Sequence, residues 1–133
     1  NSAHPDSRMA EMPAFGHDEM LSRDELGAVR DYVRGLSSGK AAAEGPGAGI
    51  FADNCAACHG ENGVGGLENG APSLADDAWI YGGDGETVWQ TLQNGRRGVM
   101  PAWQGRLSEA EIRLLALYLT RLGEAHGRKE TVK

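Results

Sequence analysis

Five residues near the middle of the chain have types and spacing that could do chemistry: Cys55-Ala56-Ala57-Cys58-His59. Two thiols three positions apart can each add to one vinyl group of a haem, and the next imidazole then lies under the iron as an axial ligand. The pattern C-x-x-C-H is the attachment motif of a c-type haem. A thiol pair alone would suit zinc or a redox disulfide, but neither needs the adjoining histidine. The motif therefore predicts one covalently bound haem c.

A haem iron held by His59 has one axial position left, and Met100 is its predicted occupant. Met100 lies 41 residues after His59, in a loop that Pro101 stiffens, just before a predicted helix. Thioether sulfur is a soft ligand that favours ferrous iron and raises the reduction potential. The alternative role for Met100 is to fill a gap in the core. Three further histidines are expected to face solvent: His4, His17 and His126.

Other residues are candidates for supporting the haem. A proximal imidazole needs an acceptor for its second nitrogen, and the carbonyl of Pro72 could provide it. Arg96 and Arg97 follow a helix-stopping glycine, and one of them could pair with a haem propionate, since guanidinium binds carboxylate well. A solvated arginine pair is the alternative. Trp89 and Trp103 could stack on the haem or simply pack in the core.

The composition limits the classes of function. A chain of 133 residues is one ordinary domain, or one small domain with part of another. A net charge of -6 argues against nucleic acid as a partner. Twenty glycines suit loops that pass close to a large flat cofactor. No apolar run approaches the roughly 18 residues that span a membrane. We find no nucleophile, paired-carboxylate or phosphate-loop pattern.

Two capping boxes predict two amphipathic helices. Ser22 and Ser108 each begin an S-x-x-E pattern, which predicts helices over residues 22–36 and 108–122. Apolar residues recur at helical spacing in both. They are Leu26, Val29, Val33 and Leu36 in the first helix, and Ile112, Leu115, Leu119 and Leu122 in the second.

The two helices belong to an internal duplication. Tyr118 follows Tyr32 at an offset of 86, and a Met-Pro-Ala-aromatic run precedes each helix, beginning at Met12 and at Met100. We therefore expect residues 1–38 to be the end of a first haem domain whose own motif is absent from the chain. The alternative is an extension whose helix packs on the one complete domain. Because Met12 corresponds to Met100 in the duplication, we expect Met12 to be the ligand of a haem that this chain lacks. It is then either unused or a competitor for the one iron that is present.

The rest of the chain predicts an all-α fold, because no stretch alternates convincingly with period two. We expect a linker over 39–46, a complete haem domain over 47–125 and a tail over 126–133. The expected elements of the haem domain are a helix leading to Cys55, a Gly-rich loop over 60–75, and helices over Asp76–Tyr81 and Gly83–Asn94.

Several of these residues are distributed as in a known family. They are Gly47, Phe51, the Cys55–His59 motif, the Ala71–Leu74 turn, Met100-Pro101 and Tyr118. On these, residues 45–123 resemble the class I cytochromes c. The resemblance implies a small all-α haem domain, preceded here by one amphipathic helix of a truncated first domain. It also implies thioethers at Cys55 and Cys58, His59 as proximal ligand, Met100 as distal ligand and Pro72 as the acceptor.

A narrower resemblance is carried by Trp79–Gly83, by Asn94–Trp103 and by Met12–Phe15 with its helix. These stretches are similar to the diheme subunit III of cbb3-type cytochrome c oxidases. That family implies a membrane anchor, two haem c domains in the periplasm, and electrons passed from a donor cytochrome c or bc1-type complex to the oxygen-reducing subunit. This chain lacks the anchor and the first motif, so we expect a soluble periplasmic truncation.

The predicted function is electron relay, by a chain that is not an enzyme by itself but serves an oxidase complex. One alternative is a haem peroxidase, which needs an open iron site and is excluded if Met100 ligates. Another is a free-standing periplasmic electron shuttle or a subunit of a different multihaem assembly. The duplication argues against a single-haem shuttle if residues 1–38 are a domain remnant.

Overall fold

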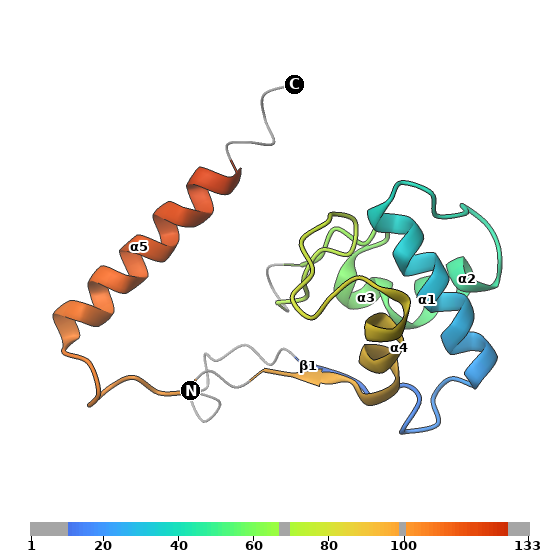
Figure 1. The fold of residues 1–133 in the computed structure, drawn as a ribbon, viewed down its shortest axis with the longest axis horizontal. Coiled ribbons are helices and arrows are strands. Elements are labelled where there is room, and N and C mark those ends of the chain that lie inside the picture. The colour runs from blue at the N-terminus through green and yellow to red at the C-terminus, as the bar shows by residue number, and fades with distance from the viewer. Residues whose placement is uncertain (1–10, 67–69, 99–100, 128–133) are drawn as a thin grey trace. The chain divides into compact units, whose positions relative to one another are not determined.

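The computed structural model describes residues 11–66, 70–98 and 101–127. The chain divides into two compact units, Ser2–Val99 and Met100–Lys133, and each is described by itself. The described residues form five helices and one ladder of two two-residue strands (Figure 1). This confirms the predicted all-α class. Within the described part of the chain, no helix has the length and apolarity to cross a membrane.

Helix α1 (Arg23–Ser37) begins at the predicted capping box. The Ser22 hydroxyl accepts from the Glu25 amide at 3.4 Å, and the Ser22 amide donates to the Glu25 carboxylate at 2.8 Å. These bonds satisfy two backbone donors that a helix start otherwise leaves unpaired. One face of α1 is buried, as its apolar spacing predicts; its buried residues are Leu26, Val29 and Val33.

Helix α2 (Pro46–Asn54) has proline in its first turn, where the missing amide costs nothing. Cys55 ends α2 and caps the short helix α3 (Ala56–His59), which carries the rest of the C-x-x-C-H motif. The helical approach to Cys55 is therefore confirmed.

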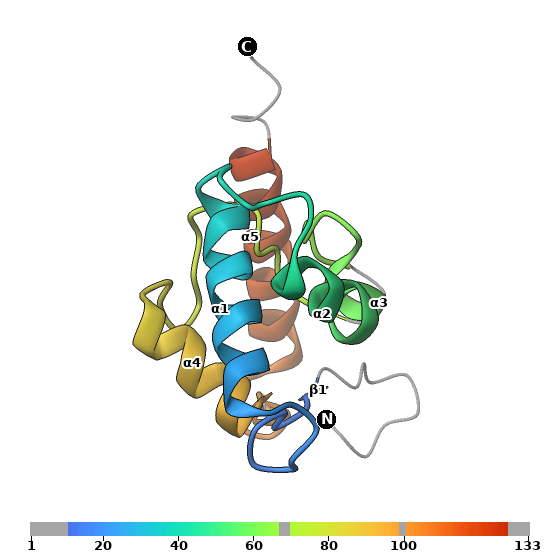
Figure 2. The same ribbon diagram turned by 90° about the vertical axis from the view of Figure 1, so that its right-hand side faces the viewer.

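Helix α1 packs across α2 (Figures 1 and 2), and the two helices approach closely at Gly47. A Cβ atom at Gly47 would lie 2.4 Å from the Ala28 carbonyl oxygen and 2.9 Å from the Tyr32 Cβ, so only glycine permits this approach. The rings of Tyr32 and Phe51 then meet with centroids 5.2 Å apart. Phe51 is almost completely buried, and the α1–α2 crossing forms the centre of the core.

Helix α4 (Gly85–Asn94) also packs on α1. Its cap is Asp84, whose carboxylate accepts from the amides of Glu86 and Thr87. Gly95, at φ 67°, ends the helix as predicted.

A two-residue ladder follows α4. Strand β2 (Arg96–Arg97) pairs antiparallel with β1 (Glu11–Met12), with Met12 opposite Arg96. A Cβ at Gly95 would lie 2.4 Å from the Met12 carbonyl oxygen, so the glycine also admits β1. The ladder is too short to produce an alternating pattern, which is why the sequence did not reveal it.

The predicted helix over Asp76–Tyr81 is wrong, because the structure has bends there. The Asp76 carboxylate accepts from the Ala78 amide at 3.0 Å, two residues on. This is a local Asx turn, which competes with helix formation.

The second unit contains helix α5 (Glu109–Gly127). Its start confirms the predicted capping box at Ser108, whose amide donates to the Glu111 carboxylate at 2.8 Å. The helix runs five residues beyond the predicted end at 122.

The structure places α1, which lies in the expected segment 1–38, against α2 and α4 of the expected haem domain 47–125. Whether residues 1–38 originate as the end of a separate haem domain stays a prediction.

Candidate haem-binding site

A cavity of about 290 Å³ within the unit Ser2–Val99 brings the C-x-x-C-H motif together with the predicted acceptor. Cys55, Cys58 and His59 line it from the α2–α3 corner, and Pro72 lines it from the Gly-rich loop. Most of the remaining lining is apolar and lies in α1, in α4 and in the segments that precede these two helices. It includes Phe15, Val33, Leu74, Trp79, Ile80, Val88 and Leu92.

The imidazole of His59 is oriented by Pro72. His59 Nδ1 lies 3.0 Å from the Pro72 carbonyl oxygen. A carbonyl only accepts, so Nδ1 carries the proton and Nε2 keeps its lone pair. This is the tautomer that a metal-binding histidine needs, with its other nitrogen held by a backbone acceptor.

Backbone hydrogen bonds fold the Gly-rich loop so that Pro72 reaches His59. The Gly65 amide donates to the His59 carbonyl at 2.7 Å, and the Leu74 amide donates to the Gly63 carbonyl at 2.6 Å. Gly63 and Gly65 both have positive φ, of 71° and 82°, which favours glycine. The loop therefore holds the acceptor in place through its own backbone.

The two thiols differ in their surroundings. Cys55 is 7% exposed, whereas Cys58 is exposed at the edge of the cavity. Burial, with a smaller contribution from Cys58, raises the pKa of the Cys55 thiol to about 11. Cys55 is therefore a neutral thiol near pH 7, which suits an apolar cavity better than a thiolate would.

The side chains of Arg96 and Arg97 lie in different environments. Arg96 lines the cavity, its guanidinium lies 4.2 Å from the Tyr81 ring centroid, and its Nε donates to the Thr91 hydroxyl at 3.0 Å. Arg97 does not line the cavity, and its Nε lies 3.8 Å from the Glu11 carboxylate. Of the pair, only Arg96 lines the cavity.

On the distal side, the predicted ligand Met100 lies outside the described residues, and so do His4, Met9 and the side chain of His126. Met12 is described, half-buried and lines the same cavity as His59. His17 and Met20 are exposed and do not line it.

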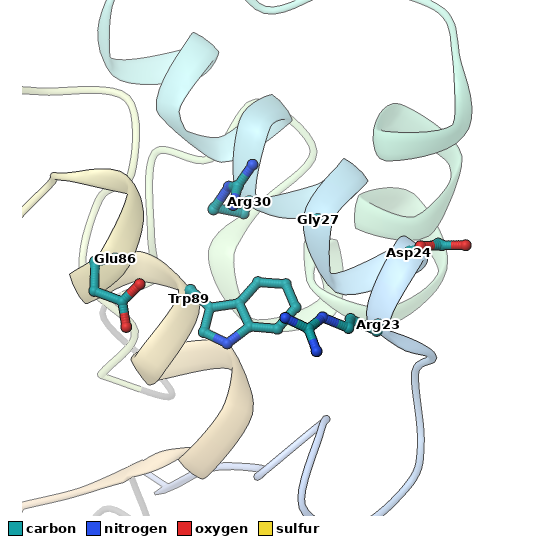
Figure 3. Close-up of a pocket in the computed structure, with 6 residues that line it drawn as sticks. All are labelled: Arg23, Asp24, Gly27, Arg30, Glu86 and Trp89. Carbon is teal, nitrogen blue, oxygen red and sulfur yellow. The ribbon is translucent and has the colours of Figure 1, made fainter.

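The aromatic lining differs from the prediction. Trp89 does not line this cavity; it borders a separate depression of about 390 Å³ between α1 and α4 (Figure 3). There the guanidinium of Arg23 points at the Trp89 ring, 5.8 Å from its centroid. Trp79 and Tyr81 line the haem cavity instead. The chain has only eight aromatic residues, and Trp79 and Tyr81 lie two positions apart. This clustering was the signal in the sequence that could have identified them as lining residues.

Trp103 lies in the other unit, where the guanidinium of Arg106 stacks over its ring at 4.7 Å. Its predicted place beside a haem stays a prediction.

The residues of the cavity fit a haem c. Two thiols and an imidazole with an available Nε2 lie at one edge of a mainly apolar space, and one arginine borders it. A zinc site would need further ligands, and the described residues contain no group of three His, Cys, Asp or Glu side chains placed to hold a metal ion.

Comparison with known proteins gives a consistent set of relatives. A CcoP subunit of a cbb3-type cytochrome c oxidase from Cereibacter sphaeroides is 48% identical over 92% of this chain and 43% of its own length. A FixP subunit from Bradyrhizobium sp. is 49% identical over 92% of this chain and 43% of its own length. A CcoP subunit from Azospirillum brasilense is 50% identical over 84% of this chain and 40% of its own length. The chain thus spans about two fifths of the length of these relatives.

A family model also matches. Its description is cytochrome c oxidase, cbb3-type, subunit III, and it covers residues 42–119, more than half of the chain. Cytochrome c families bind haem c covalently, in agreement with the cavity at Cys55, Cys58 and His59. This chain belongs to the family of subunit III of cbb3-type cytochrome c oxidases.

Proposed function

We propose that this chain relays electrons through one haem c attached at Cys55 and Cys58, with His59 and Met100 as axial ligands. The observation that carries the proposal is the 3.0 Å contact between His59 Nδ1 and the Pro72 carbonyl, at a cavity that both thiols line. When bound, the haem supplies a reversible one-electron couple.

The chain's residues attach and orient the group. Cys55 and Cys58 would hold the group through thioethers, each formed when an S–H adds across a vinyl double bond, so that no oxidant would be needed. His59 presents Nε2 because Nδ1 is held by Pro72. Arg96 can donate its terminal N–H groups to a propionate, since Nε already bonds Thr91. The apolar lining would keep water away from the bound group.

Membership in a respiratory complex rests on the names of the relatives, which are subunits of cbb3-type oxidases. We place this chain in that role: it accepts electrons from a donor cytochrome c or bc1-type complex and passes them towards the oxygen-reducing subunit. The site then faces the periplasm, and the parent protein is anchored in the bacterial inner membrane.

The proposal is tested on the chain secreted to a bacterial periplasm together with haem-attachment enzymes. We expect haem that stays bound on a denaturing gel, a low-spin reduced spectrum, and a near-infrared methionine-to-iron band in the oxidised protein. Cys55→Ser with Cys58→Ser loses the covalent haem, whereas His17→Ala, an exposed control, keeps it. A high-spin iron that reacts with peroxide would favour an enzyme instead.

Transfer to the complex is tested separately. The reduced chain is mixed with a cbb3-type oxidase that lacks its subunit III, and oxygen consumption is followed. Restored consumption supports the relay, and consumption that stays as low as without the chain would contradict it.

A further inference from the structure

Among the described residues, Arg96 is the only arginine or lysine that lines the haem cavity. Successive residues of a strand point to opposite sides, so β2 places Arg96 at the cavity and Arg97 beside Glu11. The Arg96 side chain is half-buried, and within the described ranges no carboxylate lies at ion-pair distance from it. A half-buried cation without a counterion is favourable where a bound anion joins it.

Two contacts hold the guanidinium of Arg96. Its Nε donates at 3.0 Å to the hydroxyl of Thr91, in the last turn of α4. Its Cζ lies over the ring of Tyr81, 4.2 Å from the centroid, where the negative face of the ring attracts a cation. These contacts use the Nε–H and one face of the group, and the N–H bonds of its two terminal nitrogens are left for another acceptor.

The turn that carries Tyr81 is itself held by its neighbours. Gly82 follows with φ 116°, a backbone conformation that favours glycine. Gly83 lies against the indole of Trp79, because a Cβ there would be 2.5 Å from the indole Nε1. From α1, the Arg34 Nε donates to the Gly83 carbonyl at 3.3 Å. The position of the Tyr81 ring is therefore set by the backbone around it and by a contact with α1.

Burial does not explain a tyrosine at position 81. Tyr81 lines the cavity, yet it is 53% exposed, so its ring lies where the cavity meets solvent. An apolar side chain gains little free energy at so exposed a place. A long arginine side chain beside solvent has many rotamers to choose from. Stacking on Tyr81 restricts them and keeps the charge of Arg96 at the cavity.

We propose that Tyr81 and Thr91 are positioning residues: they hold Arg96 at the cavity to pair with a haem propionate, and they influence the reduction potential through Arg96. This inference rests on the proposed function and deepens it. A guanidinium that is already held loses less side-chain entropy when it binds a carboxylate, so it binds more tightly. A positive charge kept near the iron favours the reduced state.

The role of Tyr81 is tested by redox titration of the holoprotein. Tyr81→Leu removes the ring but keeps an apolar side chain, and it should lower the potential by a large part of the shift that Arg96→Gln causes. Tyr81→Phe keeps the ring face and should keep the potential. In an Arg96→Gln background, Tyr81→Leu should have no further effect. An equal effect of Tyr81→Leu with and without Arg96 would show that the ring does not act through the arginine, and this overturns the proposal.

The contacts themselves are tested by hydrogen exchange of the Arg96 Nε–H, followed by NMR of the reduced holoprotein. Thr91→Val replaces the hydroxyl with a methyl group of similar size, and exchange should speed up about tenfold or more because a bond to a charged donor is lost. Thr91→Ser restores the acceptor and should restore slow exchange. Tyr81→Leu should speed exchange about threefold or more. Exchange that neither Thr91→Val nor Tyr81→Leu changes would contradict the two contacts.

These readouts separate this inference from the proposed function. A chain without covalent haem, or without the methionine-to-iron band, would count against the proposed function, and the inference would fall with it. A chain with both, whose potential is the same in Arg96→Gln, Tyr81→Leu and Thr91→Val as in the unmodified protein, would overturn the positioning role alone.

Discussion

His59 Nδ1 and the carbonyl oxygen of Pro72 lie 3.0 Å apart, and this contact decides which imidazole nitrogen is available to iron. Proline fixes its own φ, and its carbonyl is held in a loop with several internal hydrogen bonds. The acceptor is therefore positioned by covalent geometry as well as by packing.

A more flexible backbone at Pro72 should weaken the binding of His59 to the iron. Pro72→Gly keeps the carbonyl but frees the backbone, and we expect His59 to be displaced by added imidazole about 10–100-fold more readily, the usual effect of losing such support. Pro72→Ala, which restricts the backbone more than glycine does, should have a smaller effect. Absorbance titrations of the holoprotein measure both, and equal behaviour of the two variants would contradict the role given to Pro72.

The crossing of α1 over α2 predicts opposite effects at two glycines of one helix. Gly47→Ala places a methyl group 2.4 Å from the Ala28 carbonyl oxygen and should cost about 1–3 kcal/mol of unfolding free energy. Gly49→Ala meets nothing within 4 Å and should stabilise by about 0.5–1 kcal/mol through helix propensity. Guanidinium unfolding measures both values, and a neutral Gly47→Ala would mean that α1 does not lie there.

The arginines predict a difference in reduction potential. Arg96 lines the cavity, and a nearby positive charge favours the reduced iron, so Arg96→Gln should lower the potential by on the order of tens of millivolts. Arg97→Gln is the control, because Arg97 is exposed beside Glu11 and does not line the cavity. A redox titration decides, and an equal or larger shift for Arg97→Gln would reassign the propionate partner.

The cap of α4 predicts how stability depends on pH. Hydrogen bonds from Thr87, chiefly from its side chain, hold the pKa of Asp84 below its ordinary value. A lowered folded-state pKa gives stability that is present above the unfolded value and is lost as the pH falls through the folded value. Asp84→Asn keeps a cap but does not titrate. The unmodified chain should therefore melt higher than Asp84→Asn at neutral pH, and the two should converge in acid.

The convergence is measured by thermal unfolding of the two proteins across the acid range. The pKa values of Glu25 and Glu111 are lowered by hydrogen bonds from Ser22 and Ser108, and both residues are present in each protein, so their contributions cancel in the difference. A difference in melting temperature that does not change with pH would mean that Asp84 is not the titrating group.

Local signals predicted much of the structure. The capping boxes at Ser22 and Ser108 located the starts of α1 and α5, and Gly95 located the end of α4, because caps are read from a few neighbouring residues. The C-x-x-C-H motif likewise singled out Cys55, Cys58 and His59, and all three line one cavity. A local signal also produced the wrong prediction of a helix over Asp76–Tyr81. An aspartate side chain can cap a helix, but here that of Asp76 forms an Asx turn.

What the sequence could not predict is that α1, the first copy of the duplicated helix, packs on α2. Val29 and Leu115 occupy equivalent positions of equivalent stripes, so hydrophobic spacing is the same for both. The surface that α1 covers depends on packing against distant segments, which no local pattern contains. The same limit applies to Trp89 and Trp79, whose surroundings are set by contacts between distant segments.

The bonds that fix the proximal histidine all lie between Cys55 and Leu74. Contacts of such short sequence separation form early and quickly, because little chain entropy is lost in closing them. The proximal side can therefore take shape while the chain is still emerging and its haem is being joined. The rest of the cavity lining, which draws on residues from 11 onward and on α4, must wait for distant parts of the chain to meet.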